Sequence, residues 1–337
     1  MSVFKRLKSL DSTISFHTPG HAGKLNKLDS TEIPGVFPED FVEKAQQSVA
    51  NHYECKKLRF LVNGSSIGVK SMIMSVGGDI IAPKDRHQAV DEGVTLARVN
   101  LIEVENESKN GLPLPLTAQQ IETAIKNNSS AKAVLIQSPD YYGQTADLIA
   151  IREVCDKAGV KMLVDGAHGA HYATLTDGTF PLNPASIADA CNLSAHKTLR
   201  AYTQSAYLAI NDLSLLPAID GNLKLLGTTS PSYVFMGQLE EAPVFERKYA
   251  YGYYARIREI NKIKDKFACL KNDDPTRLVV DANALGLGGE ELYKKLLGHK
   301  IVAEKYDHRY VVFIVTLSNT LRQIKKLRRV LSSYEKR

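Results

Sequence analysis

The sequence has few cysteines, and they lie far apart. Only four occur in 337 residues, at Cys55, Cys155, Cys191 and Cys269. None belongs to a C-x-x-C pair, so the pattern predicts neither a zinc site nor a disulfide framework, and we expect no metal ligands. A reduced, cytoplasmic setting is the simplest interpretation of these isolated cysteines.

Long apolar runs and large patches of one charge are also missing. No stretch approaches the ~20 apolar residues of a membrane-spanning helix, and residues 1–8 lack the apolar region of a signal peptide. The net charge is +6, but lysine and arginine are spread along the chain. The one dense basic run, Arg322–Arg329, has apolar residues at helical spacing and indicates a solvated helix face. We therefore expect neither a membrane nor a nucleic-acid partner.

The region from residue 58 to about 210 alternates short apolar runs with amphipathic patterns. The runs predict strands at 58–62, 79–82, 99–104, 132–137 and 160–164, and the patterns predict helices from 65, at 88–97, 117–126 and 148–158. This alternation is typical of βαβ units. It predicts an α/β fold with a mostly parallel sheet flanked by helices.

The chain divides into four expected regions. Residues 1–54 form a less regular N-terminal segment, 55–215 the large domain, and 216–260 a connecting region marked by prolines and glycines. Residues 261–337 contain, in order, patterns for a strand, a helix, a strand and a helix, at 277–280, 290–297, 310–317 and 321–331. This last region is predicted to be a small C-terminal α+β domain.

Four predicted strands are followed directly by small or polar residues. These are Asn63-Gly64, Pro139-Asp140, Asp165 and Ser194. Ligands of parallel α/β sheets bind beyond the carboxyl ends of the strands. We therefore expect these positions to meet on one rim.

Lys197 and Asp165 carry the chemistry expected at this rim. Lys197 lies among small and polar residues just past an apolar strand, so it is a poor core residue and a good Schiff-base former. Asp165 ends an earlier strand, where a pyridinium nitrogen would find a carboxylate. Together they predict a site for pyridoxal phosphate (PLP), whose protein partners are a lysine and a carboxylate at the ring nitrogen. A surface lysine and a turn-capping aspartate are the alternatives for each residue alone.

A phosphate cradle is expected beside them. Gly64, Ser65 and Ser66 join a strand to a helix, where free backbone N–H groups and hydroxyls favour an anion. An ordinary glycine turn is the alternative. Ser194 and His196 can also donate to a phosphate.

Three residues are candidates for contacts with the cofactor ring. His87 opens a helix, and its imidazole could stack on a ring or move a proton. Ala167 is small enough for a flat ring to lie against the backbone. His168, like His171, is a further polar group near the rim. Each histidine has an alternative as an ordinary loop residue.

Six segments occur in a recognisable order: Phe16–His21, Asn63–Ser66, Ser138–Gly143, Asp165–His171, Ser194–Leu199 and Thr229–Tyr233. The set resembles the Orn/Lys/Arg decarboxylase major-domain family of PLP enzymes, which has the aspartate-aminotransferase fold, fold type I. The resemblance runs from about residue 14 to 330. It implies that residues 55–215 are the PLP-binding domain.

The resemblance also implies individual roles. Lys197 would hold the cofactor as a Schiff base, with Asp165 at the pyridine nitrogen and His87 stacked on the ring. The phosphate would be bound by Ser65, Ser66, Ser194 and His196. Family members are dimers with shared active sites, so the 229–233 segment, which includes Ser232, would enter the neighbouring subunit's site. Residues 216–260 would then include the dimer contact.

The sequence departs from the family pattern in several places. Ala22 stands where a lysine is usual, and Gly166 where an acidic residue is usual. Residues 236–240 do not match the family's Ser-Leu-Asp motif. The sequence also ends before the family's C-terminal part. These departures concern substrate recognition more than the cofactor.

Three functions remain open from the sequence. The first is a PLP-dependent decarboxylase of lysine, ornithine or arginine. The second is an aminotransferase or another PLP lyase, and the third is a PLP-binding protein that has lost turnover. A basic substrate needs an acidic residue at its distal cation, for which Glu32 and Asp40 are only candidates.

Overall fold

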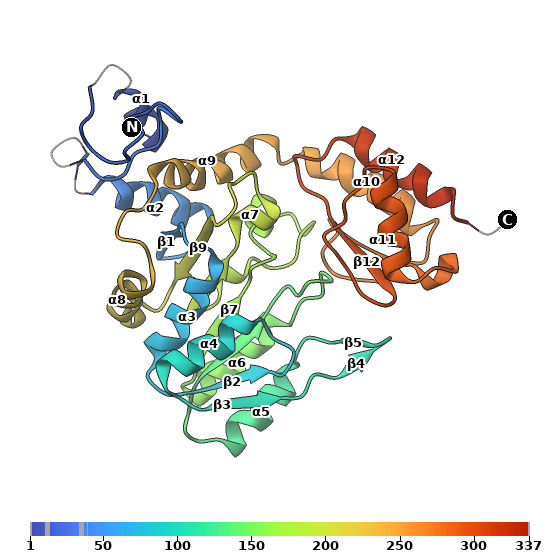
Figure 1. The fold of residues 1–337 in the computed structure, drawn as a ribbon. Helices are drawn as coiled ribbons and strands as arrows, with labels where there is room; N and C mark the ends of the chain where they lie inside the picture. Colours follow the sequence, from blue (N-terminus) through green and yellow to red (C-terminus); the bar gives the residue numbers. More distant parts are fainter. Residues whose placement is uncertain (1, 11–13, 34–36, 39, 336–337) are drawn as a thin grey trace.

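The computed structural model describes residues 2–10, 14–33, 37–38 and 40–335. A large α/β part and a smaller C-terminal part lie side by side (Figure 1). The helices are α1 (Val3–Lys8), α2 (Phe41–His52), α3 (Ser65–Val76), α4 (Gln88–Ala97), α5 (Ala118–Asn127), α6 (Leu148–Ala158), α7 (Ala195–Thr198), α8 (Leu216–Leu226), α9 (Tyr233–Tyr249), α10 (Gly252–Lys264), α11 (Gly289–Gly298) and α12 (Leu321–Ser332). The strands are β1 (Lys57–Leu61), β2 (Asp79–Pro83), β3 (Leu101–Val104), β4 (Ser108–Lys109), β5 (Leu112–Pro113), β6 (Ala131–Gln137), β7 (Lys161–Asp165), β8 (Ala190–Leu193), β9 (Ala206–Ile210), β10 (Arg277–Asp281), β11 (Lys305–Tyr306) and β12 (Tyr310–Ile314).

The central sheet has seven strands in the order β1-β9-β8-β7-β6-β2-β3. Strands β8, β7, β6, β2 and β3 are mutually parallel, while β9 is antiparallel to both of its neighbours. Strand β1 therefore points the same way as the parallel strands. The carboxyl ends of β1, β6, β7 and β8 all lie at one edge, as predicted.

Helices cover both faces of this sheet, and the strand sequences show why. In β7, Met162 and Val164 join one apolar cluster, which includes residues of α1, α2, α5, α6 and α9. Leu163, between them, joins the cluster formed with α3, α4 and α8. Because successive side chains point to opposite faces, a strand buried on both sides needs an almost unbroken apolar run. The predicted fold class is confirmed.

Several predicted boundaries agree closely with the structure. Helices α4 and α6 have the predicted ends. Thr117 caps α5 through a capping box with Gln120, in which each side chain accepts a hydrogen bond from the other residue's backbone N–H. These helices carry both an apolar face and recognisable terminal residues.

Three helices that the sequence pattern did not predict fill most of the 216–260 connecting region: α8, α9 and the first part of α10. Pro217 lies in the first turn of α8, where a missing N–H costs nothing. Pro243 lies inside α9 and cannot donate to the carbonyl of Leu239. The Tyr207 hydroxyl donates to that carbonyl instead, at 2.7 Å. A side chain distant in sequence thus satisfies the carbonyl that the proline leaves free.

The N-terminal region is also more regular than expected. Helix α2 buries Phe41, Ala45 and Val49, which are spaced four residues apart and therefore share one face. A short β4–β5 hairpin was not predicted either.

The C-terminal part has its own antiparallel sheet, in the order β10-β12-β11. Helices α10, α11 and α12 pack on it around a separate apolar cluster, which begins with Ile260 and Ile263 of α10. Strand β12 ends at Ile314, earlier than predicted. In the turn that follows, the Asn319 side chain accepts a hydrogen bond from the Thr316 N–H.

The described part of the chain contains no helix that is both long and apolar enough to cross a bilayer.

Candidate active site

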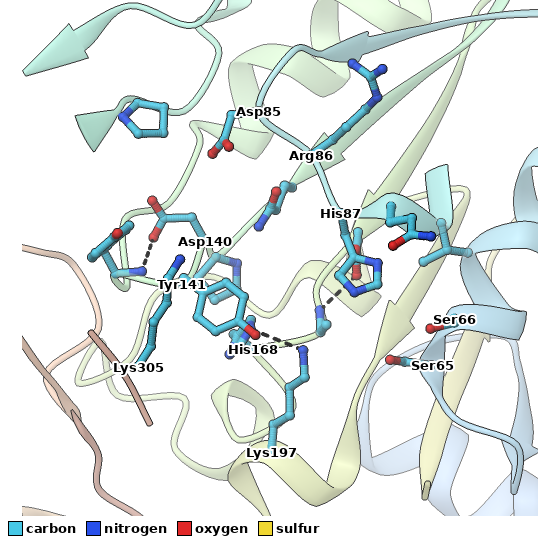
Figure 2. Close-up of a pocket in the computed structure, with 18 residues that line it drawn as sticks. Ser65, Ser66, Asp85, Arg86, His87, Asp140, Tyr141, His168, Lys197 and Lys305 are labelled. Atoms are coloured by element: carbon cyan, nitrogen blue, oxygen red, sulfur yellow. Dashed lines mark hydrogen bonds between the residues drawn. The ribbon is translucent and has the colours of Figure 1, made fainter. Parts of the chain in front are cut away.

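A cavity of about 430 Å³ lies at the carboxyl ends of the parallel strands. Its size is within the range of small-molecule sites. Figure 2 shows its lining, which comes from both parts of the chain. The lining residues are Ser65, Ser66, Val69, Asp85, Arg86, His87, Gln88, Pro113, Gln137, Pro139, Asp140, Tyr141, Tyr142, Asp165, Ala167, His168, Lys197 and Lys305.

Lys197 is held on α7, a four-residue helix between β8 and β9. Its Nζ lies 3.2 Å from Nε2 of His168 and 5.6 Å from the centre of the Tyr141 ring. Burial lowers the pKa of Lys197, although Asp165 opposes this shift. A lysine whose neutral amine is made more accessible in this way suits Schiff-base chemistry.

Asp165 ends β7 and is buried at the cavity. Its Oδ1 accepts hydrogen bonds from the Ala167 N–H at 3.2 Å and from the Asn192 side chain at 3.1 Å. Asn192 lies on the neighbouring strand β8, directly opposite Asp165 in the register. Both bonds use Oδ1, so among the described residues Oδ2 stays uncommitted. The carboxylate is oriented by the sheet and still available to a ligand.

The predicted phosphate cradle lies at the start of α3. Gly64 is the N-cap residue and has φ +86°, a value that residues with a Cβ rarely adopt. Ser65 and Ser66 form the first turn, and both line the cavity. The free N–H groups of this 12-residue helix and the two hydroxyls are therefore directed at one place.

His87 is the N-cap residue of α4 and also lines the cavity. Its Nδ1 accepts a hydrogen bond from the Ala89 N–H at 3.1 Å, so a neutral ring carries its proton on Nε2. Ala167 lines the cavity as well. The helix terminus thus fixes which nitrogen of His87 can donate.

Not every predicted site residue lies on the cavity. Ser194 is fully buried, and its hydroxyl lies 3.3 Å from Nδ1 of His196, which also approaches the Ser205 carbonyl at 3.2 Å. Ser232 donates to Asp29 at 3.3 Å. Gly64 precedes the lining residues of α3. The phosphate roles of Ser194 and His196 and the partner-site role of Ser232 stay predictions.

His171 and the two acidic candidates also lie outside the cavity lining of this chain. His171 is buried against Thr276 and Asp274, at 3.1 and 3.4 Å. Glu32 and Asp40 are not among the lining residues.

Sequence reasoning missed three residues of the site. Tyr141 packs its ring on His168, with centroids 4.4 Å apart. Asn192 orients Asp165, as described above. Asp85 lines the cavity, and among the described residues its carboxylate has no hydrogen-bonding or ionic partner. The only sequence signal for Asp85 was its position two residues before His87, at a strand end.

Two other charged side chains of the cavity, Arg86 and Asp140, already have hydrogen-bonding or ionic partners. Arg86 pairs with Asp91 and Glu103, at 2.5 and 2.6 Å. The Asp140 carboxylate accepts three hydrogen bonds, from the backbone of Tyr142 and from the backbone and side chain of Gln144.

Lys305 places its ammonium over the aromatic rings at the cavity wall. Its Nζ lies 4.7 Å from the Tyr141 ring centre and 5.4 Å from that of Tyr142. Of the three carboxylates that line the cavity, Asp140 has three hydrogen bonds and Asp165 has two, whereas Asp85 has no partner among the described residues and is best able to take a new positive charge.

The residues present fit PLP. A lysine of lowered pKa, a sheet-oriented carboxylate and a hydroxyl-bearing helix N-terminus surround one cavity, with His87 and Ala167 between them. The fold and this donor set define a fold type I PLP-dependent enzyme.

Comparison with known proteins supports the assignment to PLP-dependent enzymes. The family model for the Orn/Lys/Arg decarboxylase major domain matches residues 22–279. The chain belongs to this family. It is accordingly a PLP-dependent amino-acid decarboxylase by class, and the predicted family, cofactor and enzyme class are confirmed.

Several individual relatives have low sequence identity to this chain. The chain is 28% identical to the uncharacterized protein YaaO of Bacillus subtilis (strain 168), covering 91% of this chain and 72% of that protein. It is 28% identical to an arginine decarboxylase of Halalkalibacterium halodurans, covering 95% and 73%. The structure of lysine decarboxylase A from Pseudomonas aeruginosa superposes with a TM-score of 0.82 at 15% identity. That match covers 99% of this chain and 59% of the decarboxylase.

Proposed function

We propose that the chain decarboxylates a basic amino acid: lysine, ornithine or arginine. The observation that carries this proposal is the uncommitted carboxylate of Asp85 on the same cavity as Lys197 and Asp165. A substrate with a distal cation would find a counter-charge there. Longer relatives named arginine decarboxylase, of which the matches cover 73% and 76%, support the same substrate class.

In this proposal the residues of the cavity have separate roles. Ser65, Ser66 and the α3 N-terminus would hold the phosphate, and Lys197 would hold the cofactor covalently. Asp165 would keep a proton on the ring nitrogen, and Asn192 would hold Asp165 in place. When bound, PLP supplies an electron sink for the bond broken at the substrate α-carbon.

Protons are moved by two side chains in this proposal. His87 donates from Nε2, because Nδ1 is occupied by the helix cap. Lys197, whose amine points into the cavity in Figure 2, would return a proton to the α-carbon.

We also propose a homodimer with shared sites. The N-terminal segment exposes Ile14, Phe16 and Leu25 at 89%, 100% and 85% of their surface. Such a concentration of exposed apolar side chains on one short segment is typical of an interaction surface, and a second copy would cover it. The cytoplasmic location stays a prediction.

The test is carbon dioxide release by the PLP-loaded protein from each common amino acid. We expect release from at least one of the three basic amino acids and none from acidic or apolar ones. Release from none of the three, with PLP bound, would contradict the proposal. Formation of a keto acid would then indicate an aminotransferase.

The role of Asp85 has its own variant. Asp85→Asn should raise KM for the basic substrate about tenfold, equivalent to ~1.4 kcal/mol, and leave cofactor binding unchanged. Glu107→Gln, an exposed carboxylate outside this cavity, is the matched control for loss of one negative charge. Equal KM values in the two variants would exclude Asp85 from substrate binding.

A further inference from the structure

A short segment of the C-terminal part, Asn272–Arg277, clamps the loop that carries Tyr141. The Asn272 side chain donates to the Tyr142 carbonyl at 2.6 Å. The backbone N–H groups of Asp273 and Asp274 both donate to the Gly143 carbonyl, each at 3.0 Å. These bonds join the two parts of the chain directly beside the cavity.

The same segment reaches the loop that follows Asp165. Thr276 lies 3.1 Å from Nε2 of His171, and Asp274 lies 3.4 Å from the same nitrogen. Asp274 is fully buried. Burial alone would raise the pKa of Asp274, but His171 and Arg277 lower it overall, so the carboxylate is ionised.

Arg277 is the least expected member of this segment. Its side chain is fully buried, and among the described residues Nε and both Nη atoms have no hydrogen-bond partner. Its nearest counter-charge is Asp274, at 3.8 Å. Gly143, with φ +83°, makes room for it, because a Cβ there would lie 2.8 Å from the Arg277 Cβ. A buried guanidinium with so few partners is costly, which argues that its charge has a use.

The Arg277 charge acts on two groups at the cavity. After burial, Arg277 is the strongest influence lowering the pKa of His168, followed by Lys197, His87 and His171. Burial and Arg277 also lower the pKa of Lys197, whereas Asp165 and Glu304 raise it. The uncharged Tyr141 ring also lies beside both groups.

The contact between Lys197 and His168 requires a neutral imidazole. An ammonium has only donors, and a charged imidazole has donors on both nitrogens. A 3.2 Å contact between the two charged groups would therefore be repulsive and without a hydrogen bond. With His168 neutral, its Nε2 accepts from Lys197.

We propose that Arg277 is a positioning residue, which, from the C-terminal part, adds to the effect of burial and keeps His168 in the neutral form that contacts Lys197. The inference deepens the proposed function, since it concerns the same lysine. It also gives a function to the contact between the two parts of the chain, because the Asn272–Arg277 segment places the buried charge of Arg277 near the cavity.

The test follows the protonation of His168 by NMR in the purified full-length protein with ¹⁵N-labelled histidine, assigned with a His168→Gln variant. In the unsubstituted protein His168 should stay neutral between about pH 5 and 8. In Arg277→Gln the pKa of His168 should rise, so that a larger fraction of the imidazole is protonated at pH 5, because a repelling charge is gone while the burial remains. Arg277→Lys, which keeps the charge, should restore the neutral state. Arg309→Gln is the matched control, since Arg309 pairs with Asp281 away from the cavity.

Two results would overturn the inference. One is titration of His168 near its ordinary value of 6.5 in the unsubstituted protein, which needs no variant to fold. The other is a folded Arg277→Gln protein in which the protonated fraction of His168 at pH 5 is the same as in the unsubstituted protein. Neither readout depends on turnover, so a failure of the proposed reaction would leave this test intact.

Discussion

Asp165 illustrates how one carboxylate is prepared for a ligand by its neighbours. Asn192 and the Ala167 N–H hold Oδ1, and they leave Oδ2 uncommitted within the described residues. The sequence predicted Asp165 from its place at a strand end. It did not predict Asn192, because the register that sets the two residues opposite each other is a property of the assembled sheet.

We expect Asp165→Asn to retain PLP but to lose most activity. A neutral amide cannot keep the ring nitrogen protonated, and such charge-stabilising groups are commonly worth ~3 kcal/mol or more, above a hundredfold in kcat. Cofactor absorbance and kcat should be measured on the same preparation. Near-normal turnover would show that Asp165 serves only the structure.

Glu246 predicts a pH dependence of stability. It is buried in α9, where it accepts a hydrogen bond from the Tyr253 hydroxyl at 2.8 Å, and burial raises its pKa from 4.5 to about 7. The folded protein therefore binds this proton more tightly than the unfolded chain does. Its contribution to stability is complete below about pH 4.5 and is lost as the pH rises through 7, by up to about 3 kcal/mol.

Glu246→Gln should abolish this part of the pH dependence. The difference in the free energy of unfolding between the variant and the unsubstituted protein should grow from about pH 4.5 to 7 and then level off. Chemical denaturation at several pH values measures it. The exposed Glu241 on the same helix provides a control, Glu241→Gln. Parallel curves for all three proteins would refute the assignment.

At the scale of elements, α3 joins the phosphate cradle to the carboxylate. Its Gly68 faces Asn192, and a Cβ there would lie 2.6 Å from Asn192 Oδ1 and 2.8 Å from a Leu61 methyl. The helix that carries Ser65 and Ser66 can therefore pack this closely only with glycine at this position.

We expect Gly68→Ala to weaken PLP binding. Alanine is favoured over glycine in helices by ~1 kcal/mol, but displacement of Asn192 would cost ~1–3 kcal/mol and disturb Asp165. Titration with PLP and thermal unfolding would measure both effects. Gly221→Ala in α8, where a Cβ meets nothing within 4 Å, should instead be neutral or stabilising. Unchanged PLP affinity in Gly68→Ala would contradict the coupling.

Elements with a simple pattern were the predictable ones. The apolar run of β7 and the capped amphipathic patterns of α5 and α6 are local signals, and they were sufficient to predict these elements. Helix α9 was missed because Pro243 is unfavourable locally and is accommodated only by Tyr207, a residue 36 positions earlier. Asp85 and Arg277 were missed for the same kind of reason: their value lies in what the fold brings beside them.

At the scale of the whole molecule, shared active sites can be tested by mixing two inactive chains. Lys197→Ala removes the lysine, and Ser232→Arg should block the segment expected to enter the partner's site. A hybrid dimer has one intact site, so a mixture allowed to exchange should regain at most about a quarter of full activity. No recovery despite exchange, or a fully active monomer in sedimentation, would refute the proposal.

The pairing of β1 with β9 has a consequence for how the protein folds. Lys57 of β1 lies opposite Ile210 of β9. Strand β1 therefore cannot pair until a residue more than 150 positions later has been synthesised. At about 5–20 residues per second, a ribosome needs roughly 8–30 seconds to supply that partner. Contacts of such large separation also form slowly because of the loop-closure entropy. The cradle and Lys197 flank these two strands, so PLP can bind only the nearly finished fold. The cofactor would then stabilise the product of folding by mass action, and it could not guide the early steps.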